Sequence, residues 1–444
     1  MKSLQNKTIL ITGAGFSAPA NLPIQDKILY EMIEKAEEDF LNVDVEKNSI
    51  KFLVSYIEVA IYLLKEYTRE NVSEIEVKYN RVKNDYHAAD SILKIINFIE
   101  ENYKDSAEKK DFNLIAALSD TVEKCVIDED KYYTSLLSVK EEVRQLLQES
   151  NLKISLEDVF TSFDKSITLQ KNTSNYSYVE IDKLQHSILR LFTYYFSNKV
   201  NEHDYNTKDY KEVIHFIKEN LGNISILTTN WDILFENYLC REGIKYNYNF
   251  NSSYVLNREG NTYFENKDSD STVTYLKMHG SINWFRCLKC GTLQIYEGEK
   301  CGKYLFDDTE TEKCVKCGQE ARMDNVQIAP EIVTPTMIKS INSQLYNNIW
   351  QNAAYELQQA ERVVFCGYSL PLADFEFRHL LKQNINKSAK IDVVLYHNDD
   401  PDKVMEENIK DLLPEKRYKD LFPNNECEFF YDGFGEFFRK IADE

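Results

Sequence analysis

The chain contains little glycine and little proline, and one long stretch contains neither. Among its 444 residues there are 13 glycines and 8 prolines. No glycine occurs between Gly15 and Gly222, and no proline occurs between Pro23 and Pro330. Because tight turns between strands depend on these two residues, we expect few hairpins in that part of the chain.

Helical periodicity fills this stretch instead. One predicted helix face has apolar residues at positions i, i+4, i+7 and i+11: Leu53, Ile57, Ala60 and Leu64. Ser155 and Asp158 have the spacing of a capping box at the start of another helix. We therefore predict an all-helical insertion over residues 31–215, and we favour a role in scaffolding or oligomer contact over a catalytic one.

Positive charge and long apolar runs are also scarce. The chain has 53 lysines and arginines against 73 acidic residues, a net charge of −20. Such a chain repels a phosphate backbone, so we do not expect direct binding to nucleic acid. No run approaches the roughly 20 apolar residues of a membrane span, and the first residues lack the form of a signal peptide. We expect a cytoplasmic protein with no membrane partner.

The most informative stretch that is present covers residues 7–26. An apolar run leads into a glycine turn, and a helical pattern follows. In this geometry, glycines allow close approach and the free N–H groups at a helix start bind phosphate. The candidate pyrophosphate-binding residues are Gly13, Ala14, Gly15 and Ser17. The alternative is an ordinary strand-to-helix turn, because the usual ribose-binding acid about 20 residues later is not evident.

Four further short runs have the composition of buried strands, and a polar or glycine turn follows each. They are residues 223–229, 274–278, 362–366 and 391–396. Repeated strand, turn and helix predict an α/β fold, a Rossmann-like doubly wound parallel sheet, over residues 1–30 and 216–444. Ligands of such sheets bind at the carboxyl ends of the strands, where Asn230 and Asp232 stand.

Two C-x-x-C pairs indicate a metal site. Cys287 and Cys290 precede Cys314 and Cys317 by a spacing close to that of zinc-binding pairs. Four thiolates fill a tetrahedral Zn²⁺ and leave no position for water, so we predict structural zinc in a ribbon over residues 284–322. A nucleic-acid-binding ribbon is the alternative, which the acidic chain disfavours.

These motifs, in this order, resemble those of the sirtuin family. GAGFSAPANLP at residues 13–23 is similar to the family's GAG-x-S…P motif, and residues 229–232 are similar to its T-x-N-x-D motif. His279-Gly280 is similar to its catalytic His-Gly, the four cysteines resemble its zinc ribbon, and GYSLP at residues 367–371 resembles a later turn. The resemblance implies a Rossmann-type domain that binds NAD⁺, a zinc ribbon and a helical module.

The departures from the family are also informative. Ile24, Gln25 and Asp26 stand where the protein deacylases carry Asp-Phe-Arg. The segment GYSLPLADFEFRHLL is similar to one in bacterial sirtuin-like proteins of antiphage defence. This second resemblance implies an NAD⁺ glycohydrolase that gives nicotinamide and ADP-ribose, regulated as an effector that depletes NAD⁺ in infected cells. It also implies a homo-oligomer or an activating partner, such as a ring ATPase or an argonaute-type sensor.

The resemblance implies catalytic roles for three residues: Asn230, His279 and Asp232. It implies cofactor contacts for eight: Gly13, Ala14, Gly15, Ser17, Thr229, Gly367, Ser369 and Asn398. Two of the catalytic candidates also have a structural explanation. Asn230 is a good helix N-cap, and Asp232 is an acidic residue of the kind favoured in the first turn of a helix. Two other functions remain open, an NAD-dependent protein deacylase and a non-catalytic sensor of NAD or ADP-ribose.

Overall fold

The computed structural model describes most of the chain. The described residues are 7–22, 28–29, 31–32, 48–68, 70–84, 129–150, 152, 154–250, 254–256, 262–264, 273–296, 314, 316–317, 328–334, 336, 344–395 and 414–442. The chain separates into two units, and α8 (Tyr178–Glu202) contributes to both. The first comprises Met1–Met32, Ser155–Lys171 and Phe192–Glu444, and the second comprises Ile33–Ile154 and Asn172–Leu191.

A seven-stranded parallel sheet forms the centre of the first unit. In spatial order its strands are β12 (Cys427–Phe430), β11 (Lys390–Val394), β10 (Arg362–Cys366), β1 (Thr8–Thr12), β2 (Ile224–Thr228), β6 (Val273–Lys277) and β3 (Tyr246–Asn247). Every neighbouring pair is parallel. The central strand, β1, is buried along its length, as expected for an apolar strand covered on both faces. The predicted doubly wound parallel sheet is confirmed.

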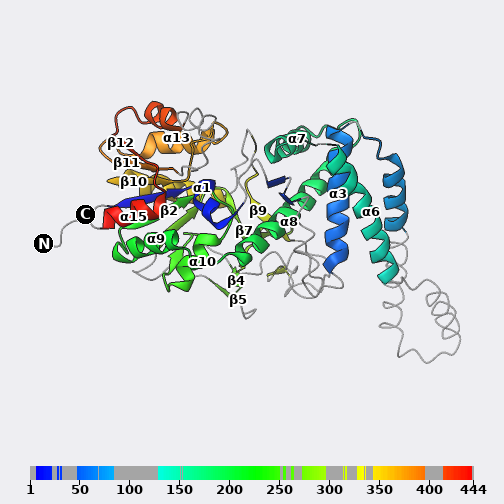
Figure 1. Cartoon of the computed structure of the whole chain (residues 1–444), viewed down its shortest axis with the longest axis horizontal. Helices are drawn as coiled ribbons and strands as arrows, with labels where there is room; N and C mark the ends of the chain where they lie inside the picture. The colour runs from blue at the N-terminus through cyan, green and yellow to red at the C-terminus, as the bar shows by residue number, and fades with distance from the viewer. Residues whose placement is uncertain are drawn as a thin grey trace, which may run out of the picture. The chain divides into compact units, whose positions relative to one another are not determined.

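Helices cover both faces of this sheet. They are α1 (Ala14–Ser17), α9 (Lys208–Glu219), α10 (Leu234–Arg241), α12 (Gln344–Gln358), α13 (Phe375–Asn384) and α15 (Phe434–Ala442), and the 3-10 helix η1 covers Ala18–Ala20. Figure 1 shows α9 and α15 on one side of the strands and α13 on the other. Aromatic rings join α9 to α15, since Phe216 lies 5.2 Å from Phe438 between ring centroids. The apolar faces of the helices thus close the core on both sides.

A smaller sheet carries the cysteine turns. Its strands are β5 (Thr262–Phe264), β4 (Tyr254–Leu256), β8 (Leu293–Tyr296), β7 (Gly280–Cys287) and β9 (Ile328–Ile332), in that order. Pro330 lies inside β9, although a proline cannot donate a backbone hydrogen bond to a neighbouring strand. As the last strand in the order, β9 pairs along one side, where a missing N–H is tolerated.

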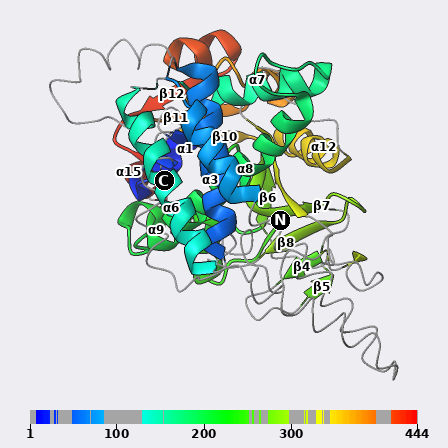
Figure 2. The same ribbon diagram turned by 90° about the vertical axis from the view of Figure 1, so that its right-hand side faces the viewer.

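The second unit, for which the glycine-free stretch predicted helices, is helical in its described part. Its helices α3 (Asn48–Tyr67) and α6 (Glu129–Glu149) lie side by side, as Figures 1 and 2 both show. The four residues of the predicted apolar face of α3 are all buried: Leu53, Ile57, Ala60 and Leu64. Helix α7 (Leu156–Leu169), which belongs to the first unit, begins with the predicted capping box, in which Ser155 Oγ accepts from Asp158 N at 3.1 Å.

The division into units places two parts of the predicted helical insertion elsewhere. Residues 155–171 and 192–215 belong to the same compact unit as the parallel sheet. Tyr210 on α9 illustrates this, because its hydroxyl donates to the carbonyl of Phe16 at 2.7 Å. Among the described helices, none is long and apolar enough to cross a bilayer.

Candidate active site and cysteine cluster

Several predicted site residues lie in turns at the carboxyl ends of the parallel strands, which together form the carboxyl edge of the sheet. The turn after β1 carries Gly13, the turn after β2 carries Asn230, and the turn after β6 carries His279. Gly367 follows β10, which pairs with β1 on the other side. The chain runs from β1 to β2 on one side and later returns to β10 on the other. This edge is therefore the switch point of the sheet, where ligands of doubly wound folds bind.

The glycine turn after β1 packs closely against the turn after β10. Gly13 N–H donates to the carbonyl of Cys366 at 3.1 Å, and Gly15 N–H donates to the carbonyl of Gly367 at 2.9 Å. A Cβ atom on Gly15 would lie 2.9 Å from Gly367 Cα. These two N–H groups are therefore committed to the protein. Helix α1 is only four residues long, so its dipole adds little to anion binding.

Gly367 is the tightest point of this contact. Its φ is +62°, and a Cβ atom there would lie 2.2 Å from Phe16 N. We expect Gly367→Ala to destabilise the protein by several kcal/mol, because backbone strain adds to a clash with backbone atoms that cannot move aside. Gly243→Ala is the matched control, since Gly243 has a φ of +70° with nothing within 4 Å of its Cβ position.

Thermal unfolding of the two variants measures this difference. The control should lose only the cost of the left-handed backbone, about 1–2 kcal/mol. Equal losses in Gly367→Ala and Gly243→Ala would show that the two turns do not pack as closely as described.

Asn230 is fixed by a chain of hydrogen bonds. Its Nδ2 donates to the carbonyl of Gly13 at 2.9 Å and to Ser17 Oγ at 3.0 Å. Because a carbonyl can only accept, the nitrogen of the amide must face Gly13, which settles the orientation of the side chain. Ser17 Oγ donates in turn to Asp232 Oδ2 at 2.9 Å. Within the described part of the chain, no group donates to Asn230 Oδ1.

Asp232 is buried behind Asn230. Its second oxygen, Oδ1, accepts from Leu234 N at 3.0 Å at the start of α10. Burial raises the pKa of Asp232, while Lys277 and the hydrogen bonds from Leu234 and Ser17 act in the opposite direction. The carboxylate therefore serves both as an anchor for the helix start and as the acceptor that orients Ser17.

His279 lies at the end of β6 and is almost fully buried. Its Nε2 lies 3.9 Å from Asp374 Oδ1, and Tyr368 OH donates to the other oxygen of Asp374 at 2.8 Å. Its carbonyl accepts from Val333 N at 2.9 Å, which ties the turn to β9. The following Gly280 has a φ of +78°, and a Cβ atom there would lie 2.2 Å from Glu331 O. The His-Gly pair thus combines a polar side chain with a backbone position that requires glycine.

The remaining predicted contact residues are less closely joined. Thr229 borders Asn230, and its Oγ1 donates to the carbonyl of Thr12 at 3.5 Å. Ser369 is exposed, and its carbonyl accepts from Arg417. Ala14 is exposed at the glycine turn. Asn398 lies outside the described residues.

The sequence patterns missed two groups of polar side chains near this edge. The first is Lys277 with Glu236, buried beneath the turn that carries Asn230. The second is Asp374, which faces His279 from the start of α13. A lysine two residues before the histidine and an aspartate shortly after a strand-end turn were the available signals, and neither belongs to a motif with a known chemistry.

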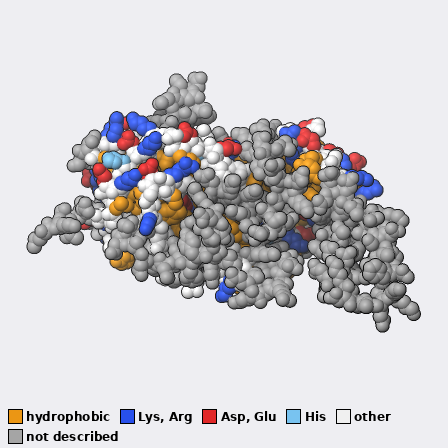
Figure 3. Space-filling model, turned by 90° about the horizontal axis from the view of Figure 1, so that it is seen from below, with side chains coloured by type: hydrophobic (Ala, Val, Ile, Leu, Met, Phe, Trp, Pro, Cys, Tyr) orange, Lys and Arg blue, Asp and Glu red, His pale blue; other side chains and the backbone are white. Residues whose placement is uncertain are grey.

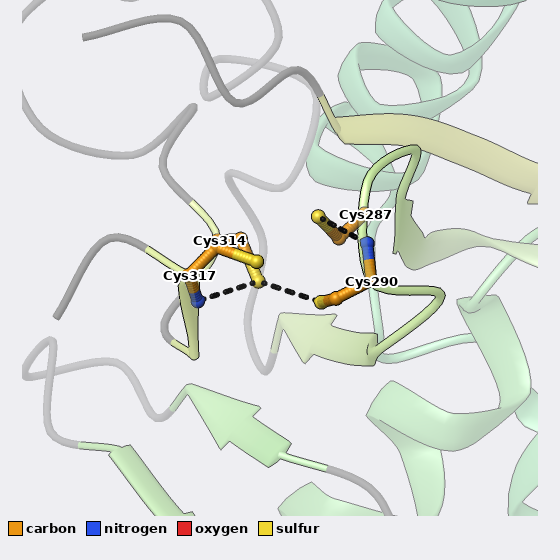
Figure 4. A group of neighbouring side chains, drawn as sticks. All are labelled: Cys287, Cys290, Cys314 and Cys317. Carbon is orange, nitrogen blue, oxygen red and sulfur yellow. Dashed lines mark hydrogen bonds between the residues drawn. The ribbon is translucent and has the colours of Figure 1, made fainter. Parts of the chain in front are cut away.

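The four predicted metal ligands come together in the smaller sheet (Figure 4). The Sγ atoms of Cys287, Cys290, Cys314 and Cys317 all lie within 4.8 Å of one another. Cys290 Sγ lies 3.6 Å from Cys314 Sγ, close to the roughly 3.8 Å edge of a tetrahedron with Zn–S bonds of about 2.3 Å. Backbone N–H groups point at the sulfurs within both pairs, from Cys290 to Cys287 and from Cys317 to Cys314. The donor set fits Zn²⁺.

A family model matches part of the chain, and several solved structures align with it. Residues 224–417 match the family model of the SIR2-like domain. Among solved structures, a sirtuin studied for substrate affinity aligns over 98% of this chain and 93% of its own, with 12% identity and a TM-score of 0.33.

Two further solved structures are similar at the same level. A Sir2 protein bound to a propionylated peptide aligns over 59% of this chain and 81% of its own, with 16% identity and a TM-score of 0.31. A Sir2–p53 peptide–NAD⁺ complex aligns over 64% and 89%, with 14% identity and a TM-score of 0.30. No curated protein matches the chain. Residues 224–417 are therefore similar to the SIR2-like domain, the family that the motifs of the sequence resemble.

Proposed function

We propose that this protein cleaves the nicotinamide–ribose bond of NAD⁺ and releases nicotinamide and ADP-ribose. The observation that carries the proposal is the fixed orientation of Asn230. Both of its amide protons are committed to Gly13 and Ser17, so its Oδ1 is the atom left for a ligand. That atom lies at the switch point of the sheet, at the carboxyl edge that also carries His279.

Cleavage of the nicotinamide–ribose bond does not require a strong general acid. Nicotinamide leaves as a neutral molecule from a cationic pyridinium, so the leaving group requires no proton. The protein must stabilise an oxocarbenium-like ribose and deliver water to its anomeric carbon. Asn230 Oδ1 accepts a hydrogen bond from a ribose hydroxyl or from that water. His279 serves as the general base, a role suited to imidazole near neutral pH.

The cysteine cluster has a separate role in this proposal. Zn²⁺ bound by four thiolates supplies structure, because no coordination position remains for water or substrate. Cys287 and Cys290 lie where β7 leads into β8, and β7 begins directly after His279. The ion would therefore support the strand that follows the catalytic turn.

Two observations favour hydrolysis over the alternatives. The deacylase residues Asp-Phe-Arg are replaced by Ile24, Gln25 and Asp26, which lie outside the described residues. Hydrogen bonds from Asn230 to Ser17 and from Ser17 to Asp232 hold Asn230 Oδ1 in one orientation toward a ligand. A protein that only senses NAD⁺ does not require such a fixed orientation. A protein deacylase remains the second candidate, because the match to the SIR2-like domain fits a deacylase as well as an NAD⁺ hydrolase.

Product analysis separates these functions. Purified protein is incubated with NAD⁺, with and without an acetylated peptide, and nicotinamide and ADP-ribose are quantified by chromatography. We expect nicotinamide and ADP-ribose in equal amounts without peptide. Release that depends on the peptide would establish a deacylase instead, and binding of NAD⁺ without either product would establish a sensor.

Ser17 and Asp232 act through Asn230, so their loss should be milder than its own. We expect Ser17→Ala and Asp232→Asn each to lower kcat by about 10- to 100-fold, because a misplaced group loses about that much. The double variant should lose little more than either single variant, since both break one chain. Fully additive losses, measured as kcat at saturating NAD⁺, would show that the two residues act independently.

Regulation is a further part of this proposal. An unrestrained NAD⁺ hydrolase destroys its own cell's cofactor, so an off state is required. We propose that self-assembly or an activating protein controls it, as the resemblance to antiphage sirtuin-like proteins implies, with NAD⁺ depletion of infected cells as the outcome.

Figure 3 shows lysine and arginine side chains mixed among acidic ones on the described part of one face, so the net charge is not gathered into one acidic patch there.

A further inference from the structure

A buried ion pair lies directly beneath the two turns that carry Asn230 and His279. Lys277, the last residue of β6, has no exposed side-chain surface, and its Nζ lies 2.6 Å from Glu236 Oε1. The same ammonium donates to the backbone carbonyl of Asp232. Glu236 also accepts from Tyr275 OH at 3.1 Å and from Tyr248 OH at 3.4 Å. The charges are thus fully desolvated and surrounded by hydrogen-bonding groups.

Stability alone does not explain this arrangement. A buried ion pair is often no more stable than apolar side chains of similar volume, because both charges lose their hydration. Burial raises the pKa of Glu236 and Lys277 opposes that rise, so the pair offsets only part of its own desolvation. What the pair adds is a directional hydrogen bond from β6 to the turn after β2.

The positions that this bond connects are those of the proposed catalytic residues. Lys277 stands two residues before His279, and Asp232 stands two residues after Asn230. We propose that Lys277 is a positioning residue that sets the distance between His279 and Asn230. The inference rests on the proposed function, because it assigns the lysine a role in the same reaction.

Neutralising both partners separates positioning from stability. In Lys277→Met, Glu236 loses its counter-ion, so both the unfolding midpoint and kcat should fall. In Lys277→Met/Glu236→Gln neither charge of the pair remains, and the midpoint should recover part of its loss. The bond to Asp232 is still missing there, so kcat should stay about 10- to 100-fold below that of the parent.

A second ion pair in the same sheet provides the matched control. Asp392 on β11 is fully buried and accepts from Arg362 Nε at 2.6 Å. Arg362 begins β10 and therefore lies toward the amino ends of the strands, away from the site. Asp392→Asn should lower the unfolding midpoint and leave kcat unchanged per folded molecule.

The affinity for ADP-ribose, measured by titration, tests the position of Asn230 and His279 without any turnover. This ligand carries the ribose but has no nicotinamide to lose. We expect the double variant to bind it about tenfold more weakly, the effect of losing one well-placed hydrogen bond. Weaker binding supports the inference even if the parent releases no nicotinamide, an outcome that would remove the proposed function alone. Parental affinity in the double variant, or a kcat that recovers along with the midpoint, would overturn it.

Discussion

His279→Ala should lower kcat for NAD⁺ cleavage by about 10²- to 10⁴-fold, the usual contribution of a general base. Asn230→Ala should lower it by about 10²- to 10³-fold, because one preorganised group aimed at the reacting ribose is lost. Both side chains lie at the ends of strands rather than inside them. Neither change should therefore alter the fold. The measurement is the rate of nicotinamide release at saturating NAD⁺.

A histidine outside the site provides the control for this result. His215 is exposed on α9 and lies 3.6 Å from Glu219. His215→Ala should retain the parental rate, and all three variants should remain folded and retain the parental zinc content. Full activity in either His279→Ala or Asn230→Ala would remove that residue from the mechanism.

Removal of zinc should have the largest effect on structure. Structural zinc sites contribute roughly 10–16 kcal/mol of apparent binding free energy in small zinc-binding peptides, and that free energy becomes folding free energy. We expect one zinc per chain, and we expect a strong chelator or Cys287→Ser to expose β7 and β8 to solvent. Hydrogen exchange of their backbone amides measures this, and it should rise there before it rises in the parallel sheet.

Activity should fall with zinc loss only as the smaller sheet loosens. Cys240→Ser is the matched control, because Cys240 is an exposed cysteine outside the cluster. That variant should keep its zinc and its exchange pattern. A metal-free protein in which β7 and β8 remain protected would contradict a structural role for the ion.

The strands of the parallel sheet could be predicted from the sequence because their signal is local. A strand buried on both faces must be apolar along its length, and β1, β2 and β10 are each short apolar runs that end in a turn. The four cysteines could be predicted for a similar reason. Their spacing alone determines whether two thiolates reach one ion.

Other features depend on contacts between distant segments and could not be predicted. Gly15 and Gly367 lie far apart in the sequence, so the glycine turn suggested a phosphate site, whereas both glycines also serve a close backbone contact. The pair of Lys277 and Glu236 has no sequence pattern, since a lysine near a strand end usually reaches solvent. The strand β9 contains Pro330, and a proline is tolerated there because β9 is paired along one side only.

The central claim is that the carboxyl edge of the sheet holds the ribose from which nicotinamide leaves. A crystal structure of the full chain with ADP-ribose tests this claim most directly. We expect the distal ribose within hydrogen-bond distance of Asn230 Oδ1, with His279 beside the anomeric carbon. ADP-ribose bound elsewhere, or bound at this edge with its distal ribose turned away from both side chains, would contradict it.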